Sequence, residues 1–465
     1  MPRRHQHEFP HTDLQVRWQN FRPFEDTGWL TFRPLTVLLG ANNSGKTSVL
    51  APLLLLNQTM ASRDLNAPLV SQAELFEAPS FTGLVRDHDE KRQIELGLRF
   101  HTHSADEDDL ETAVGDVPPG VLEVALRAGE EPDRAILTKF AIQDIYLRTM
   151  LTRILKSDGT YSVEGLPRQS EMSPTEMAAL RRSTPLHFMF APAYEVSQFI
   201  SPEGEKRTPR SPPDFTQPFS LYLTMCGFVF TEVSKLLDRL SYVGPLRERL
   251  KHHYRTQPIP RTVGPTGKDA ANLLLRRYDD LEPALNKWIS AFDLGEKIVY
   301  RYLSKSKDLF ALELVSGRRR LNVADAGFGT SQVLPLIVQA LAAEKGSVLL
   351  AEQPEIHLNP RLQATLADLF VSMATNNRPV VVETHSEHLL LRLRRLIADD
   401  VIPANRVALY FVERKGDHSQ IRQIEIGPNG HIDPQEWPAD FFGDTLQESL
   451  ALARSQAKKL SNRAR

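Results

Sequence analysis

The chain has 465 residues, of which 41% are hydrophobic and 25% charged, so it can bury a core and is not mostly disordered. With 56 Lys and Arg against 58 Asp and Glu, the net charge of −2 gives no bulk attraction to nucleic acid or anionic lipid, which leaves only a local basic patch open. The single cysteine, Cys226, indicates a reducing compartment, and neither a signal peptide nor an apolar run of membrane-spanning length is found. We therefore expect a cytoplasmic protein that makes no contact with a membrane.

In the N-terminal half, apolar periodicity predicts mostly strands. Strands are expected at 14–18, 29–32, 35–39, 121–126 and 136–145, with a weaker one at 186–190, and a helix at 46–57. Two stretches rich in acidic residues or proline, 104–116 and 201–218, are typical of exposed loops.

The C-terminal half alternates between strands and helices. Helices are expected at 219–240, 282–292, 330–343, 361–375 and 388–398, and strands at 298–303, 310–315, 347–350 and 380–383. Two further strands at 407–413 and 421–426 and an amphipathic helix from Asp444 end the chain. Strands alternating with helices of this length predict a parallel α/β sheet.

One motif carries clear chemistry. Residues Gly40 to Thr47 fit G-x-x-x-x-G-K-[ST] completely, after an apolar strand and before a helix, which is the context that a phosphate-binding loop requires. Lys46 would reach the β- and γ-phosphates, and the Thr47 hydroxyl would bind Mg²⁺. The other interpretation is a chance match on a glycine-rich turn. The residues expected to hold the nucleotide here are Gly40, Asn42, Asn43, Ser44, Gly45, Lys46, Thr47 and Ser48.

Two polar residues follow later apolar strands. Glu352 ends one strand and is the expected second magnesium ligand, while His385 follows the next strand and is a candidate sensor of the γ-phosphate. A surface acid and a structural histidine are the respective alternatives. A third segment, Gly327 to Gln332, opens a helix and either binds an anion or merely caps that helix through Thr330 or Ser331.

In this order, the phosphate loop, Gly327–Gln332, Glu352–Pro360 and Thr384-His385-Ser386 resemble the ATP-binding-cassette (ABC) clade of P-loop ATPases. The likeness is nearest to the RecF, SMC and OLD type. Finer motifs, such as Tyr242-Val243-Gly244-Pro245-Leu246-Arg247, resemble bacterial AAA family ATPases with a C-terminal extension of unknown function, akin to ATPase subunits of anti-phage defence systems.

The resemblance implies a P-loop NTPase fold with an ABC-ATPase-like head, which is a mixed sheet flanked by helices, with an inserted α+β segment and a small extension. The implied parts are an N-terminal lobe with the phosphate loop (1–150), an inserted segment (151–300), a C-terminal lobe with the signature, acidic strand and switch histidine (301–400) and the extension (401–465). It also implies ATP and Mg²⁺ as cofactors. Gly329 and Ser331 would cap the γ-phosphate bound by a second subunit, which implies a homodimer.

One position departs from that pattern. The residue after the magnesium acid is usually a second acid that polarises water, but here it is Gln353, which cannot accept a proton. Gln353 could still orient a water, and Glu355 or Glu383 could act as the base. We therefore expect slow or partner-triggered hydrolysis, with Lys46, Gln353, Glu355 and His385 as the catalytic candidates.

Partners are the least determined feature. The basic runs Arg247–Arg255 and Arg318–Arg320 either contact DNA phosphates or form solvated faces, with Arg247 alternatively a helper at the nucleotide. The residues after Asp400 are too few for a built-in nuclease, so a nuclease effector would be a separate chain. The expected function is an ATP-driven dimerising switch for DNA or an effector, with anti-phage defence as its setting. A RecF-type DNA-repair ATPase and a non-hydrolytic ATP-binding scaffold are the alternatives.

Overall fold

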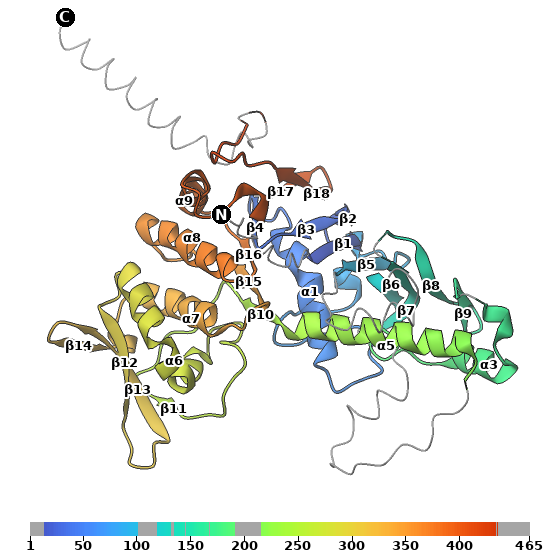
Figure 1. Cartoon of the computed structure of the whole chain (residues 1–465), viewed down its shortest axis with the longest axis horizontal. Helices are drawn as coiled ribbons and strands as arrows, with labels where there is room; N and C mark the ends of the chain where they lie inside the picture. Colours follow the sequence, from blue (N-terminus) through green and yellow to red (C-terminus); the bar gives the residue numbers. More distant parts are fainter. Residues whose placement is uncertain are drawn as a thin grey trace, which may run out of the picture.

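The computed structural model describes residues 14–100, 119–131, 134–144, 146–166, 168–190, 215–433 and 435. A mixed sheet of 14 strands runs through the molecule, and a second sheet of four strands lies beside it (Figure 1). In spatial order, the first thirteen strands of the large sheet are β10 (Leu240–Val243), β15 (Val348–Glu352), β16 (Val380–Glu383), β4 (Leu35–Gly40), β17 (Val407–Lys415), β18 (His418–Ile424), β2 (Phe24–Asp26), β1 (Leu14–Phe21), β5 (Ile94–Arg99), β6 (Pro119–Ala128), β7 (Ala135–Asp144), β8 (Thr149–Leu155) and β9 (Tyr161–Glu164). The fourteenth strand, β3 (Leu30–Phe32), pairs with β1.

The first five strands in that order are parallel, as the alternation of strands and helices predicts. Every residue of β4 is buried, because helices cover both faces of this part of the sheet. Leu38 packs into the hydrophobic cluster that contains α1 (Lys46–Met60) and α5 (Gln217–Asp238). Val37 and Leu39 point to the opposite cluster. The fold expected from the sequence, a mixed sheet flanked by helices, is confirmed.

The opposite cluster contains four helices, α6 (Ala270–Ala291), α7 (Phe328–Ala342), α8 (Pro360–Thr375) and α9 (Glu387–Ala398). The small sheet packs one face on α6 and consists of β11 (Tyr254–Arg255), β12 (Lys297–Tyr302), β13 (Leu309–Ser316) and β14 (Arg319–Asn322). The remaining described α-helix is α3 (Pro174–Arg182), which Ser173 caps.

Some expected elements differ from the structure. Helix α6 begins at Ala270, well before the expected start at 282, and passes through Pro283. Residues 186–190 form no strand and make only an isolated bridge between Leu186 and Met189. The expected helix from Asp444 lies outside the described residues.

The antiparallel strands β5 to β9 form one meander. Because β8 pairs with β7, the meander crosses residue 150, where the N-terminal lobe was expected to end and the inserted segment to begin. β10, which lies within the expected segment 151–300, is a strand of the parallel sheet beside β15. Among the described residues, no helix is long and apolar enough to cross a membrane.

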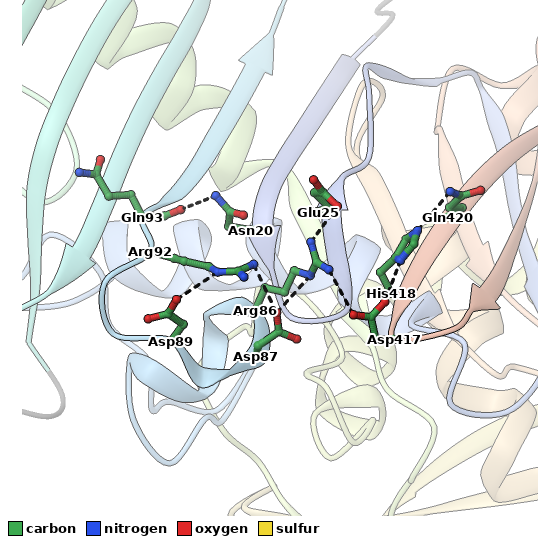
Figure 2. A network of polar contacts seen from close by, with 10 residues as sticks. All are labelled: Asn20, Glu25, Arg86, Asp87, Asp89, Arg92, Gln93, Asp417, His418 and Gln420. Carbon is green, nitrogen blue, oxygen red and sulfur yellow. Dashed lines mark hydrogen bonds and ion pairs between the residues drawn. The ribbon is translucent and has the colours of Figure 1, made fainter.

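Arg86 connects the start of the chain to the C-terminal hairpin. Its side chain is 10% exposed and lies 2.9 Å from Glu25 Oε2 of β2, 3.5 Å from Asp87 Oδ2 and 3.9 Å from Asp417 Oδ2 in the turn between β17 and β18 (Figure 2). Two residues further, the Ser419 amide donates to the Pro23 carbonyl at 2.8 Å. The guanidinium therefore holds together three segments that are far apart in the sequence.

We predict that Arg86→Ala lowers the free energy of unfolding by about 1–3 kcal/mol, because a nearly buried cation with three carboxylate partners is lost. Urea denaturation measures this change. The matched control is Arg134→Ala, whose ion pair with Glu131 is 70% exposed on both sides and should change stability by less than about 0.5 kcal/mol. Equal effects of the two substitutions would contradict the role given to Arg86.

Candidate functional site

The phosphate loop (Gly40–Thr47) joins β4 directly to α1, and its backbone requires glycine at two positions. A Cβ on Gly40 would collide with the carbonyl oxygen of Val412 in β17. Gly45 has φ of 102°, and a Cβ there would lie 2.7 Å from the ring of Pro23. Glycine is thus required by close neighbours and by a left-handed backbone, which makes a chance match of the motif untenable.

Lys46 is nearly buried and folds back over its own loop. Its Nζ donates to the carbonyl oxygens of Gly40 at 3.0 Å and Ala41 at 2.8 Å. Burial lowers the pKa of Lys46, while Glu383 and Glu355 oppose that shift. The hydroxyl of Ser44 is buried in the same loop without a hydrogen-bond partner among the described residues. The Lys46 ammonium and the Ser44 hydroxyl are therefore two donors in one loop, as expected of a phosphate-binding loop.

Two glutamates lie side by side at the ends of adjacent strands, since Glu352 of β15 is paired in register with Glu383 of β16. The Thr47 hydroxyl donates to Glu383 Oε2 at 3.0 Å, although the sequence had assigned Glu352 as the acid that works with Thr47. β16 separates β15 from β4, so Glu383 is on the strand next to the phosphate loop. Burial, with the neighbouring Glu383, raises the pKa of Glu352 to about 8. Burial likewise raises the pKa of Glu383.

This arrangement fits a magnesium ion. Glu352 is 5% exposed, and its Oε1 has no hydrogen-bond partner in the described part of the chain. Mg²⁺ prefers oxygen ligands and is commonly held by one or two carboxylates together with substrate phosphates. The described residues contain no group of three His, Cys, Asp or Glu that could hold a metal ion. Thr47, Glu352 and Glu383 would hold the ion, which would neutralise charge on the phosphates.

The predicted catalytic residues follow these strands. Gln353 has φ of 42°, and its amide donates to the Glu383 carbonyl at 2.8 Å. Glu355 is buried, and its Oε1 accepts the His385 amide at 2.7 Å. Burial and the nearby Lys46 lower the pKa of His385 to about 4, so its ring is neutral at pH 7 and can donate or accept a hydrogen bond. The structure therefore brings Lys46, Gln353, Glu355 and His385 to one edge of the sheet.

The segment expected to act on a second subunit opens α7. The helix is capped by Gly327 without any side-chain hydrogen bond, so the interpretation of Thr330 or Ser331 as the cap is wrong. Ser331 is 7% exposed, and its Oγ accepts the Leu250 amide at 3.4 Å. A Cβ on Gly329 would lie 3.5 Å from Leu358, directly after the acidic strand.

Two residues near this edge were missed or misplaced by sequence reasoning. Arg247 belongs to a basic run that was considered for DNA, but it is 5% exposed and donates to the Glu352 carbonyl at 3.0 Å. DNA contact by Arg247 is therefore ruled out, and a role of Arg247 as a helper at the nucleotide stays a prediction. Tyr242, in β10, interacts electrostatically with Glu352. The motif Tyr242–Arg247 was visible in the sequence, but nothing in its spacing indicated these contacts.

Family models match three parts of the chain. Residues 15–165 match "AAA ATPase domain", and residues 230–392 match "AAA domain, putative AbiEii toxin, Type IV TA system". The chain carries an AAA ATPase domain. Residues 402–452 match "Protein of unknown function (DUF3696)", which agrees with the expected C-terminal extension of unknown function, while the expected kinship to anti-phage defence subunits stays a prediction.

No curated protein matches the chain. Among solved structures, the AAA ATPase domain is similar to SMC head domains. The head from Thermotoga maritima has 10% identity and a TM-score of 0.38, covering 90% of this chain and 100% of that chain. A head with an extended coiled coil bound to the C-terminal domain of ScpA, from Pyrococcus furiosus, has 11% identity and a TM-score of 0.40, covering 88% and 96%. A head bound to the C-winged helix domain of ScpA has 11% identity and a TM-score of 0.42, covering 90% and 98%.

We predict that the melting temperature of Glu352→Gln depends less on pH than that of the wild type. The folded-state pKa of about 8 lies above the ordinary glutamate value, so folding keeps a proton on Glu352 that the unfolded chain releases above pH 4.5. The contribution of this bound proton to the free energy of unfolding is fully present below pH 4.5 and is lost as the pH rises through 8. From pH 6 to 9, the melting temperature of the nucleotide-free wild type should therefore fall further than that of Glu352→Gln.

The control is Glu344→Gln at an exposed site, which should melt in parallel with the wild type at every pH. Addition of MgATP should raise the melting temperature of the wild type and of this control but leave Glu352→Gln nearly unchanged. Parallel melting of all three proteins would show that Glu352 neither holds a proton nor binds the metal.

Proposed function

We propose that the chain binds ATP with Mg²⁺ at the phosphate loop and hydrolyses it slowly. The observation that supports this most is the direct hydrogen bond from Thr47 to Glu383, which joins the loop to a buried acidic strand end. Lys46 and Glu352 Oε1, which has no hydrogen-bond partner among the described residues, support the same proposal, because a magnesium-bound triphosphate needs a cationic group, a hydroxyl and carboxylates close together.

Slow turnover follows from the groups beside that site. Gln353 can orient a water but cannot take its proton. Glu355 is a buried carboxylate two residues beyond Gln353, and one of its oxygens already accepts a hydrogen bond from the His385 amide. Burial raises the pKa of Glu355, so this side chain holds a proton more readily than an ordinary glutamate and must lose it before acting as a base.

A homodimer that closes on ATP is the second part of the proposal. An exposed aromatic patch, made of Phe328, His357 and Arg249, lies at the start of α7 next to Gly329. The rings of Phe328 and His357 meet edge to face at 4.7 Å, and the Arg249 guanidinium lies 5.5 Å from the Phe328 ring. Aromatic and arginine side chains are enriched in protein interfaces. Gly329 and Ser331 would then face the nucleotide of the second subunit.

The closed dimer would signal to DNA or to an effector such as a separate nuclease, and anti-phage defence is the proposed setting. Exposed cations on the small sheet favour an anionic partner, since residues 296–322 hold seven Lys or Arg against three Asp or Glu. A DNA-repair role of the RecF type uses the same features.

A non-hydrolytic ATP-binding scaffold is the competing candidate, and Gln353 favours it. In that case ATP would close the dimer and remain intact.

Steady-state ATP hydrolysis, with and without duplex DNA, separates these functions. We predict that the wild type turns over ATP slowly and that Lys46→Ala is about 100-fold slower or more, because the charge facing the phosphates is lost. Stimulation by DNA would support a DNA-coupled ATPase. Wild-type rates equal to those of Lys46→Ala, despite measurable ATP binding and with turnover appearing in Gln353→Glu, would establish the scaffold instead.

Dimerisation has its own test. We predict that Phe328→Asp reduces the dimer fraction that wild-type protein forms with MgATP, because a charge is introduced into the aromatic patch; light scattering after size exclusion measures this. Leu391→Asp, at a residue of α9 that is 56% exposed, is the matched control and should dimerise normally. An ATP-dependent dimer that is equally abundant in both variants would place the interface elsewhere.

A further inference from the structure

Arg247 is a buried cation held between two parts of the domain. It follows β10 in the loop Gly244-Pro245-Leu246, and its side chain is almost entirely enclosed. Nη1 donates to Gln332 Oε1 of α7 at 3.3 Å. Nη2 donates to the carbonyl oxygens of Glu352 at 3.0 Å and Gln353 at 3.3 Å. One guanidinium therefore joins the first turns of α7 to the end of the acidic strand.

The loop containing Arg247 makes a second contact with α7. The Leu250 amide donates to Ser331 Oγ, the residue next to Gln332. Burial lowers the pKa of Arg247 to about 10, so the side chain remains charged at pH 7. A buried charge that is not balanced by a hydrogen-bonded carboxylate is costly, and it persists only where the surrounding structure compensates that cost.

The strand end that Arg247 holds is strained. Gln353 has φ of 42°, a left-handed conformation that is unfavourable for a residue with a side chain. Its carbonyl accepts from Arg247, and its amide donates to Glu383. Hydrogen bonds on both sides of this residue thus fix the direction in which the chain continues toward Glu355.

A basic and an acidic side chain are both buried at this junction. Arg247 Nε and Glu355 Oε2 are both buried, and neither has a hydrogen-bond partner among the described residues. Glu355 is electrostatically coupled to Arg247 and is hydrogen-bonded to the His385 amide through its other oxygen. Arg247 is consequently placed where any movement of Glu355 or Gln353 changes its own contacts with α7.

We propose that Arg247 is a positioning residue that couples the first turns of α7 to the Gln353–Glu355 loop, so that nucleotide binding and the placement of the water-facing groups change together. The proposal rests on the function proposed above and adds the residue that transmits it. Arg247 itself touches neither nucleotide nor water in this mechanism. It acts by fixing two carbonyls and one amide side chain with a planar fork of donors, which a lysine cannot reproduce.

The test compares Arg247→Lys and Arg247→Ala with Lys251→Ala, a control four residues away whose side chain is exposed and which lies outside the aromatic patch. Affinity for a fluorescent ATP analogue should stay within about threefold of the wild type in Arg247→Lys, while kcat falls about 100-fold, since small misplacements of reacting groups are that costly. Lys251→Ala should retain the wild-type kcat. Rescue of kcat by lysine would overturn the proposal, because charge alone would then suffice.

Hydrogen–deuterium exchange provides a readout independent of turnover. MgATP should slow exchange at residues 327–334 in wild-type protein and in Lys251→Ala but not in Arg247→Lys, although all three bind nucleotide. Protection of 327–334 that is equal in Arg247→Lys would overturn the coupling. If wild-type protein binds ATP without hydrolysing it, the proposed hydrolysis is wrong. The hydrogen–deuterium exchange at residues 327–334 still tests whether Arg247 couples nucleotide binding to α7. Should Arg247→Ala fail to fold, Arg247→Lys carries the test.

Discussion

The site depends on burying carboxylates at the ends of neighbouring parallel strands. Glu352 and Glu383 are paired in register, and both are almost completely enclosed. Burial raises the free energy of both charged forms and is the main reason why their pKa values are raised, and the neighbouring Glu383 adds to the shift at Glu352. Lys46 offsets only part of this cost. A divalent cation would offset much more, so the folded chain is arranged for a ligand that brings positive charge with its phosphates.

The C-terminal hairpin belongs to this same arrangement. β17 pairs with β4 in parallel register, which sets the Val412 carbonyl against Gly40 of the phosphate loop. The following turn lies against Pro23 through Ser419 and against Arg86 through Asp417. The described part of the extension of unknown function therefore completes the sheet and supports the phosphate loop from one side. Its sequence, two short strands after the last helix, had indicated only a small appendage.

Sequence reasoning was most successful where chemistry and local structure coincide. The phosphate loop requires glycine, a preceding strand and a following helix, and all three can be read within a dozen residues of Lys46. It was less successful where contacts depend on strand order. Thr47 meets Glu383 and not Glu352 because β16 lies between β15 and β4, and no local pattern specifies that order. The start of α6 was also predicted wrongly, since the helix was expected from 282 but begins at Ala270 and continues through Pro283.

Arg247 shows why an exposed basic run and a buried anchor look alike in a sequence. Lys251 and Arg255 are exposed, but the turn after β10 directs Arg247 inward, where backbone carbonyls accept its protons. Those carbonyls belong to Glu352 and Gln353, so the cation lies directly behind the acidic strand end. In the coupling proposed above, a charge added by magnesium or removed from the γ-phosphate would be transmitted to α7 through the Arg247 guanidinium, which makes two of its three hydrogen bonds to backbone carbonyls of the acidic strand end.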